Sequence, residues 1–207
     1  MPLLNIDAFR QTPLTTSPFE FCVVRNFVKP DAADRIATDF PPISNAGSFP
    51  ISALEYGPVF DQLLDELRSE ELREAFGEKF AIDLSGRPTT LTVRGRTGQR
   101  DGRIHVDSKT KLITVLLYLN QNWTAPGGQL RLLRSGDDIE DSIEEITPDS
   151  GTMVAFRCRE NAWHGHKQHV GERRSIQLNW VVSDAAVRRS QFVHGVSSFL
   201  KRLRRAS

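Results

Sequence analysis

Residues 103–120 read RIHVDSKTKLITVLLYLN, and this stretch decides both the fold and the chemistry that we expect. His105 and Asp107 are two residues apart, so on a strand both side chains leave the same face. A second imidazole, at His164, and a guanidinium, at Arg174, follow later in the chain. Two histidines and one carboxylate with three metal positions left open form the facial triad of non-haem Fe(II) oxygenases. An arginine suits a dicarboxylate co-substrate, because its planar fork matches a carboxylate and keeps its charge. Together these residues predict an iron enzyme that consumes 2-oxoglutarate.

The strand that follows Asp107 is one of a series of short β-rich segments in the second half of the chain. Gly, Asp and Pro separate these segments, which is typical of strands joined by turns. The segments are Thr89–Arg94, Lys111–Asn120, Gln129–Leu133, Ile143–Ile146, Thr152–Phe156 and Arg173–Ser183. The first third is helical after one strand, and about eight short strands follow. This order predicts an α+β fold, a double-stranded β-helix or jelly-roll barrel with N-terminal helices packed on one face.

Proline residues and the spacing of apolar residues predict where the elements of the N-terminal part begin and end. We expect a strand over Phe19–Arg25, a helix from Pro30 to about Phe40, a loop over 43–57, and one or two amphipathic helices over Val59–Lys79, broken near Ser69. At 207 residues the chain is expected to form one domain. Its parts would be a mainly helical support (1–87), the jelly-roll core (88–183) and a basic C-terminal helix (184–207).

Composition narrows the class of protein. The net charge is +1, so no global field favours nucleic acid or a membrane surface. No apolar stretch approaches the roughly 20 residues that a membrane helix needs, and the first ten residues do not resemble a signal peptide. Cys22 and Cys158 have no metal-ligand spacing, and two lone thiols favour a reducing compartment. We therefore expect a cytoplasmic protein without a nucleic-acid partner and without stable membrane insertion.

Five elements in series resemble the prolyl-4-hydroxylase-like 2-oxoglutarate/Fe(II) dioxygenases. They are the His-X-Asp run at His105, the Thr-X-X-X-Tyr-Leu-Asn strand over 114–120, the Gly-Gly strand from Gly127, the Pro-X-X-Gly turn at Pro148, and a second histidine with an arginine about ten residues on. The match covers about residues 88–183. It implies the jelly-roll fold, with Fe(II) and O2, with 2-oxoglutarate as co-substrate, and with ascorbate as an optional further cofactor.

The resemblance also assigns residues to roles. The iron ligands would be His105, Asp107 and His164. The co-substrate would contact Arg174, Tyr118 and Thr114, with Trp180 at the family's position six beyond the arginine. In that family, oxidative decarboxylation of 2-oxoglutarate to succinate and CO2 drives hydroxylation of a C–H bond. The chain departs from the pattern at Gly95, where the family usually supplies a tyrosine, and it lacks the proline between the second histidine and the arginine.

Several points stay open at the level of sequence. His166 has the same strand parity as His164, and the ten-residue spacing to Arg174 is what favours His164. Strand alternation places Arg174 with Ile176 and Leu178 on an apolar face, which we take as the core face, and Arg173 on a polar outer face. An arginine on a core face needs an anionic partner, and 2-oxoglutarate would supply one.

Two other classes of function compete with the hydroxylase. One is a cupin-like metal-binding or regulatory protein without turnover, and the other is an enzyme that uses a different divalent metal for isomerisation or hydrolysis. Neither needs an anchor for a dicarboxylate. The substrate is not identified by the sequence, and a small molecule, a peptide or a glycan all fit the pattern.

Overall fold

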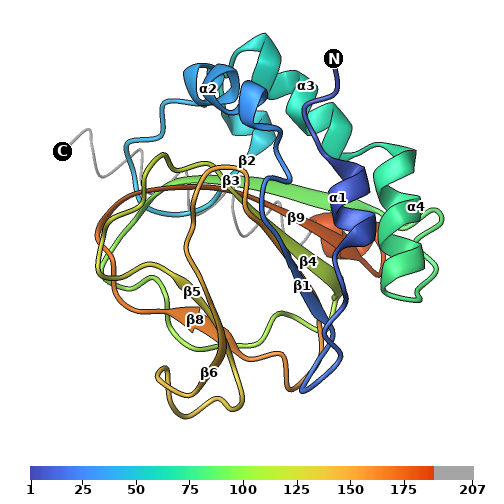
Figure 1. Ribbon diagram of the computed structural model, residues 1–207, viewed down its shortest axis with the longest axis vertical. Coiled ribbons are helices and arrows are strands. Elements are labelled where there is room, and N and C mark those ends of the chain that lie inside the picture. Colours follow the sequence, from blue (N-terminus) through green and yellow to red (C-terminus); the bar gives the residue numbers. More distant parts are fainter. Residues whose placement is uncertain (189–207) are drawn as a thin grey trace.

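The computed structural model describes residues 1–188, and two antiparallel sheets dominate it (Figure 1). The larger sheet has the strand order β1-β7-β4-β9-β3-β2, and the smaller has the order β6-β5-β8. The strands are β1 (Phe21–Val24), β2 (Phe49–Pro50), β3 (Thr89–Thr97), β4 (Lys111–Tyr118), β5 (Leu130–Leu133), β6 (Ser142–Ile146), β7 (Met153–Arg157), β8 (His164–His166) and β9 (Gly171–Val181). The smaller sheet faces the larger one, which is the double-stranded β-helix that the sequence predicts.

Four α-helices lie together on the face of the larger sheet that points away from the smaller sheet (Figure 1). They are α1 (Ile6–Gln11), α2 (Pro30–Asp39), α3 (Pro58–Leu67) and α4 (Glu70–Lys79), with a short 3-10 helix η1 (Ile51–Ala53) before α3. Proline at the first position begins α2 and α3, where its missing N–H costs nothing. Ser69 caps α4 by accepting a hydrogen bond from the Leu72 amide. The predicted break near Ser69 is therefore confirmed.

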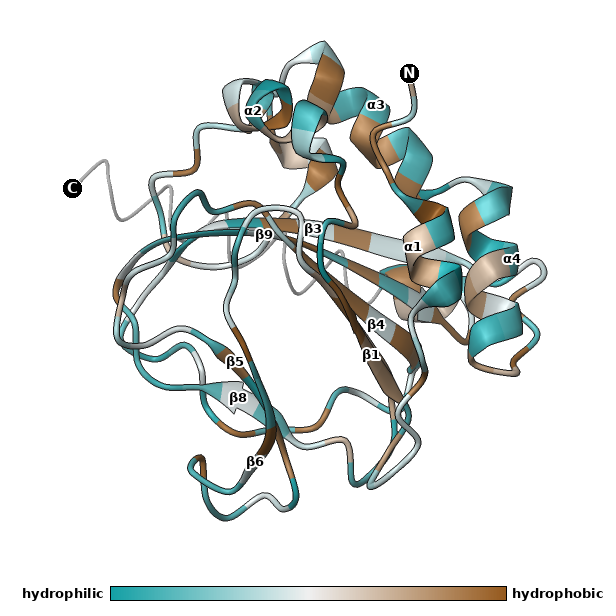
Figure 2. Cartoon of the chain, in the orientation of Figure 1, coloured by the Kyte–Doolittle hydropathy of each residue, from teal (hydrophilic) through white to brown (hydrophobic). Residues whose placement is uncertain are grey.

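Two separate apolar clusters hold these layers together. The larger lies between the helices and the larger sheet, and its apolar residues appear along β1 and β4 and as bands on the helices in Figure 2. The smaller lies between the two sheets and includes Tyr118, Leu132 and Phe156. Successive residues of β4 alternate between the two clusters, as a pleated strand requires. Strand β4 therefore has a helix side and a barrel side.

Most of the predicted elements form, with four differences. Helix α1 and strand β8 were not predicted from the sequence, and the predicted loop 43–57 contains β2 and η1. Strand β3 also runs three residues further than expected. A C-terminal helix was predicted over 184–207, and residues 189–207 of it lie outside the described part of the chain.

Candidate metal centre and co-substrate cavity

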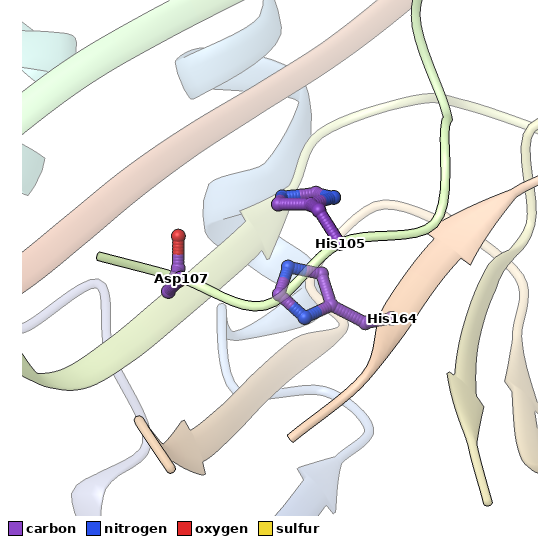
Figure 3. A group of neighbouring side chains, drawn as sticks. All are labelled: His105, Asp107 and His164. Carbon is purple, nitrogen blue, oxygen red and sulfur yellow. The ribbon is translucent and has the colours of Figure 1, made fainter. Parts of the chain in front are cut away.

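His105, Asp107 and His164 meet between the two sheets, where each offers one ligand atom and these atoms lie within 4.8 Å of one another (Figure 3). An isolated antiparallel bridge joins the backbones of His105 and His164, with both N···O distances at 3.0 Å. Asp107 follows two residues later on the same face. This is the only such group of metal-binding side chains in the part of the chain that the structure describes.

The two imidazoles are oriented so that each presents the same kind of nitrogen to the centre. His105 Nδ1 lies 2.9 Å from the Arg103 carbonyl, and His164 Nδ1 lies 3.0 Å from the Ala162 carbonyl. A carbonyl oxygen can only accept, so each Nδ1 donates a proton to it and Nε2 is the nitrogen available to a metal. Burial, followed by the electrostatic effect of His105, lowers the pKa of His164 to about 4. The ring is therefore neutral at neutral pH, as a metal ligand must be.

Asp107 is held by two neighbours. Its Oδ1 accepts a hydrogen bond from Lys111 Nζ at 2.6 Å, and its Oδ2 accepts one from Thr114 Oγ1 at 2.5 Å. Burial alone would raise the pKa of Asp107, but the ammonium of Lys111 and the nearby His164 hold it below its ordinary value. The carboxylate is ionised and fixed in orientation, and two imidazoles with one carboxylate suit Fe(II).

A cavity of about 240 Å³ opens beside the three ligands. Most of its lining residues have polar side chains, and the cavity side of β9 supplies Arg173, Ser175, Gln177 and Asn179. The predicted alternation along β9 is therefore confirmed, but the face that was expected to hold the co-substrate is wrong. Ile176, Leu178 and Trp180 do share one face, but that face packs against the helices, whereas the polar face lines the cavity.

Arg173 takes the position that the sequence analysis assigned to Arg174. Only 5% of Arg173 is exposed, its Nε donates to the Gly128 carbonyl at 2.8 Å, and its Nη2 donates to the Tyr118 hydroxyl at 3.3 Å. Both of these partners are neutral, and no salt bridge involves Arg173 within residues 1–188. A buried guanidinium without a carboxylate marks a site for an anion.

Arg174 and Trp180 lie outside the cavity, so the co-substrate contacts predicted for them are corrected. The Arg174 guanidinium lies 5.0 Å above the Phe40 ring and pairs with Glu172 at 3.1 Å, on the helix side of the sheet. Trp180 is 1% exposed and packs on Phe76 with ring centroids 4.8 Å apart. Arg173 lines the cavity instead of Arg174, and the residue six positions beyond Arg173 is Asn179, which lines the cavity as well.

Tyr118 and Thr114 lie on the barrel side of β4, as predicted. The Tyr118 hydroxyl contacts Arg173, and its ring lies 5.0 Å from that guanidinium. Thr114 links Asp107 to the cavity wall, since its Oγ1 also lies 3.0 Å from Asn179 Oδ1. His166 lines the cavity but is not part of the metal group, which favours His164 as the third ligand.

The structure also explains the departure at Gly95. The ladder between β3 and β9 shifts register between Arg94 and Arg96, and the extra residue of this bulge lies on β9, where Arg173 and Arg174 together oppose Gly95. A Cβ at Gly95 would lie 2.7 Å from Ile43 Cβ, so a side chain has no room there. Arg94 instead lines the cavity and pairs with Asp101 at 3.0 Å.

A second bulge exposes Lys111, which the sequence analysis did not single out. The pairing of β4 with β9 shifts between Lys111 and Ile113. Regular alternation would place Leu112 on the barrel side with Thr114, but Leu112 packs against the helix-side cluster and Lys111 lines the cavity. The sequence shows two lysines shortly after Asp107, Lys109 and Lys111, but only the register shift reveals that Lys111 is the one that faces the cavity.

Comparison with known proteins agrees with this site. Residues 94–181 match the family model described as 2OG-Fe(II) oxygenase superfamily. No curated protein matches the chain. Two solved structures share the fold: a prolyl-4-hydroxylase from Pseudomonas putida (17% identity, TM-score 0.53, 86% of this chain and 93% of that one), and a viral collagen prolyl hydroxylase from Paramecium bursaria Chlorella virus-1, in complex with 2OG (17% identity, TM-score 0.54, 79% and 96%).

These matches confirm the resemblance seen in the motifs. Residues 94–181, which hold all three metal-binding side chains and Arg173, belong to the 2OG-Fe(II) oxygenase superfamily. The fold is that of the prolyl hydroxylases. The protein is a 2-oxoglutarate-dependent dioxygenase that uses Fe(II) and O2, which disfavours the binding-protein and isomerase alternatives. No helix in residues 1–188 combines the length and the hydrophobicity needed to cross a membrane.

Proposed function

We propose that this 2-oxoglutarate- and Fe(II)-dependent dioxygenase hydroxylates a C–H bond of its substrate and converts 2-oxoglutarate to succinate and CO2. His105, Asp107 and His164 would hold the iron, and Arg173 with Tyr118 would hold the distal carboxylate of 2-oxoglutarate. The observation that carries this proposal is the buried Arg173, which has only neutral partners in the same cavity as a group of three metal ligands.

Different residues of the chain would orient the metal ligands and the co-substrate. Fe(II), when bound, supplies the activation of O2 that couples decarboxylation to hydroxylation. Thr114 holds Asp107 in its ligating orientation, and the Arg103 and Ala162 carbonyls fix the two imidazoles. Arg173 fixes one end of the dicarboxylate, so its keto acid end reaches the metal in one orientation.

We also propose a cytoplasmic location, which is supported by two cysteines that are both free thiols. The residues named so far fit a small molecule, a peptide or a glycan as the substrate. That nucleic acid is not a partner stays a prediction.

The decisive experiment is a spectrum followed by a product assay. Anaerobic addition of Fe(II) and 2-oxoglutarate should produce a weak visible charge-transfer band, and addition of O2 should yield succinate. Asp107→Ala should lose the band, and Arg174→Lys, on the helix side, should keep it. If the protein binds iron and 2-oxoglutarate but shows neither band nor succinate with any compound of a metabolite and peptide library, the proposal is wrong.

A further inference from the structure

The charged groups around the cavity are paired in a particular way. Three cationic side chains line it, Arg94, Lys111 and Arg173, together with two carboxylates, Asp101 and Asp107. Arg94 pairs with Asp101 at 3.0 Å, and Lys111 pairs with Asp107 at 2.6 Å. Arg173 has no carboxylate partner, which fits its proposed role toward 2-oxoglutarate. Arg94 and Lys111 are therefore each paired with a carboxylate of the cavity wall, and Arg173 is not.

Loading the site changes this balance, if the proposed function holds. Fe(II) brings two positive charges and 2-oxoglutarate brings two negative ones, so the three cations and two carboxylates of the wall leave one positive charge over. The residue that loses its partner is Lys111, because Asp107 then shares its charge with the metal. An unmatched charge in a partly enclosed site favours an anion there.

The position of Lys111 makes it a built feature of the site. The bulge between Lys111 and Ile113 turns the side chain into the cavity, and 22% of that side chain is exposed. Lys109, two residues earlier, is an ordinary surface lysine with an 85% exposed side chain that pairs with Glu160. The chain thus places one lysine beside the metal ligands and a chemically identical one outside.

We propose that the substrate is a small polar anion whose carboxylate or phosphate group pairs with Lys111 beside the metal. This inference rests on the proposed function. The same wall of the cavity fits the rest of such a molecule, because Ser175, Gln177 and Asn179 line it with hydroxyl and amide groups from β9, the strand paired with β4. Leu116 and Leu130 add apolar side chains to the lining. Electroneutral peptidyl proline would leave Lys111 unmatched.

The test measures binding without turnover. Protein loaded with Mn(II) and 2-oxoglutarate would be titrated by calorimetry with matched pairs of probes: free amino acids and hydroxy acids against their amides, and phosphomonoesters against the parent alcohols. In the pair of probes that binds most tightly, we expect the Kd of the anion to be about tenfold or more below that of its neutral counterpart. Lys111→Gln should reduce that ratio to near one, Lys111→Arg should keep most of it, and Lys109→Gln should leave it unchanged.

A second readout separates this role from a structural one. Removing a positive charge beside a dication should leave Mn(II) affinity equal or higher in Lys111→Gln. A tenfold loss of Mn(II) affinity would instead mean that Lys111 serves only to orient Asp107, and it would overturn the proposal. So would a wild-type protein that binds no anion better than its neutral partner, or that prefers a blocked prolyl peptide.

The two proposals can fail separately. A wild-type protein that never converts 2-oxoglutarate to succinate would refute the proposed function. Normal succinate formation, with stimulation that does not distinguish acids from amides, would refute only the role of Lys111. Melting temperatures of the variants, measured in parallel, identify any variant that does not fold.

Discussion

The exchange of roles between Arg173 and Arg174 gives the sharpest test of the site. The two arginines are adjacent on β9, so their side chains point to opposite faces of the larger sheet. Arg173 is 5% exposed and lines the cavity. Arg174 lies against Phe40 and Glu172 on the helix side. Each arginine is therefore the matched control for the other.

Arg173→Lys should weaken 2-oxoglutarate binding while the metal is retained. Lysine keeps the charge but loses the planar fork, and it cannot keep both the Gly128 and the Tyr118 hydrogen bonds that orient Arg173. Hydrogen bonds to charged groups contribute about 1.5–3 kcal/mol. At about 1.4 kcal/mol per decade, the Kd for 2-oxoglutarate should rise roughly ten- to a hundredfold.

The assay is calorimetric titration of 2-oxoglutarate into the Mn(II)-loaded protein, with circular dichroism to verify folding. Arg174→Lys should change the Kd by less than about twofold, because the contacts that it alters, with Glu172 and Phe40, lie on the helix side of the sheet and not in the cavity. Equal effects at the two positions, or a larger effect at Arg174, would refute the assignment of the cavity face of β9.

Three further outcomes follow from the same structure. His164→Ala should abolish Mn(II) binding measured by calorimetry, whereas His166→Ala should keep it, since only the first lies in the group of metal ligands; the opposite pattern would reassign the ligand. Trp180→Ala should lower the free energy of unfolding in urea by about 3–5 kcal/mol and leave the Kd for 2-oxoglutarate of the folded protein unchanged, because Trp180 packs in the helix-side cluster; a weakened Kd in protein that remains folded would contradict that placement. Burial raises the pKa of Cys22 and of Cys158 to about 12, so at pH 8 both thiols should react slowly with iodoacetamide in the native protein and readily after unfolding, as mass spectrometry would show; fast native labelling of either would show that it is not buried.

The elements with strong local signals could be predicted from the sequence. Proline at position 30, apolar residues spaced three and four apart after Pro58, and a cap at Ser69 define the helices α2, α3 and α4 without any tertiary information. The short α1 and the three-residue β8 have no such signal. Strand β8 exists because it pairs with β5, from Leu130–His166 to Leu132–His164, and such pairing cannot be seen in a three-residue segment alone.

The pair His105 and Asp107 was found for a local reason as well. Their two-residue spacing fixes a common face on any extended chain, and the structure brings them to His164. Lys111 could not be found in this way. It stands next to a register shift on β4, and a bulge moves one residue to the other face without leaving a mark in the alternation of apolar and polar residues. Arg94 shares the cavity face of β3 with Thr92 by regular alternation, but alternation alone does not show which face lines a cavity.

The wrong choice of the co-substrate face of β9 has a different cause. In this architecture, the apolar face of a central strand is not the one that lines the cavity. The larger sheet is buried on both sides, so the alternation on β9 does not separate inside from outside. It separates the side that packs against helices, which is apolar, from the side that lines the cavity, which is polar. Arg173, Ser175, Gln177 and Asn179 are polar although they face the interior, because that interior is the cavity beside the metal-binding group and not the apolar core. In a sheet with an internal cavity, the polar face of a central strand is therefore the candidate binding face, and the apolar face is the structural one.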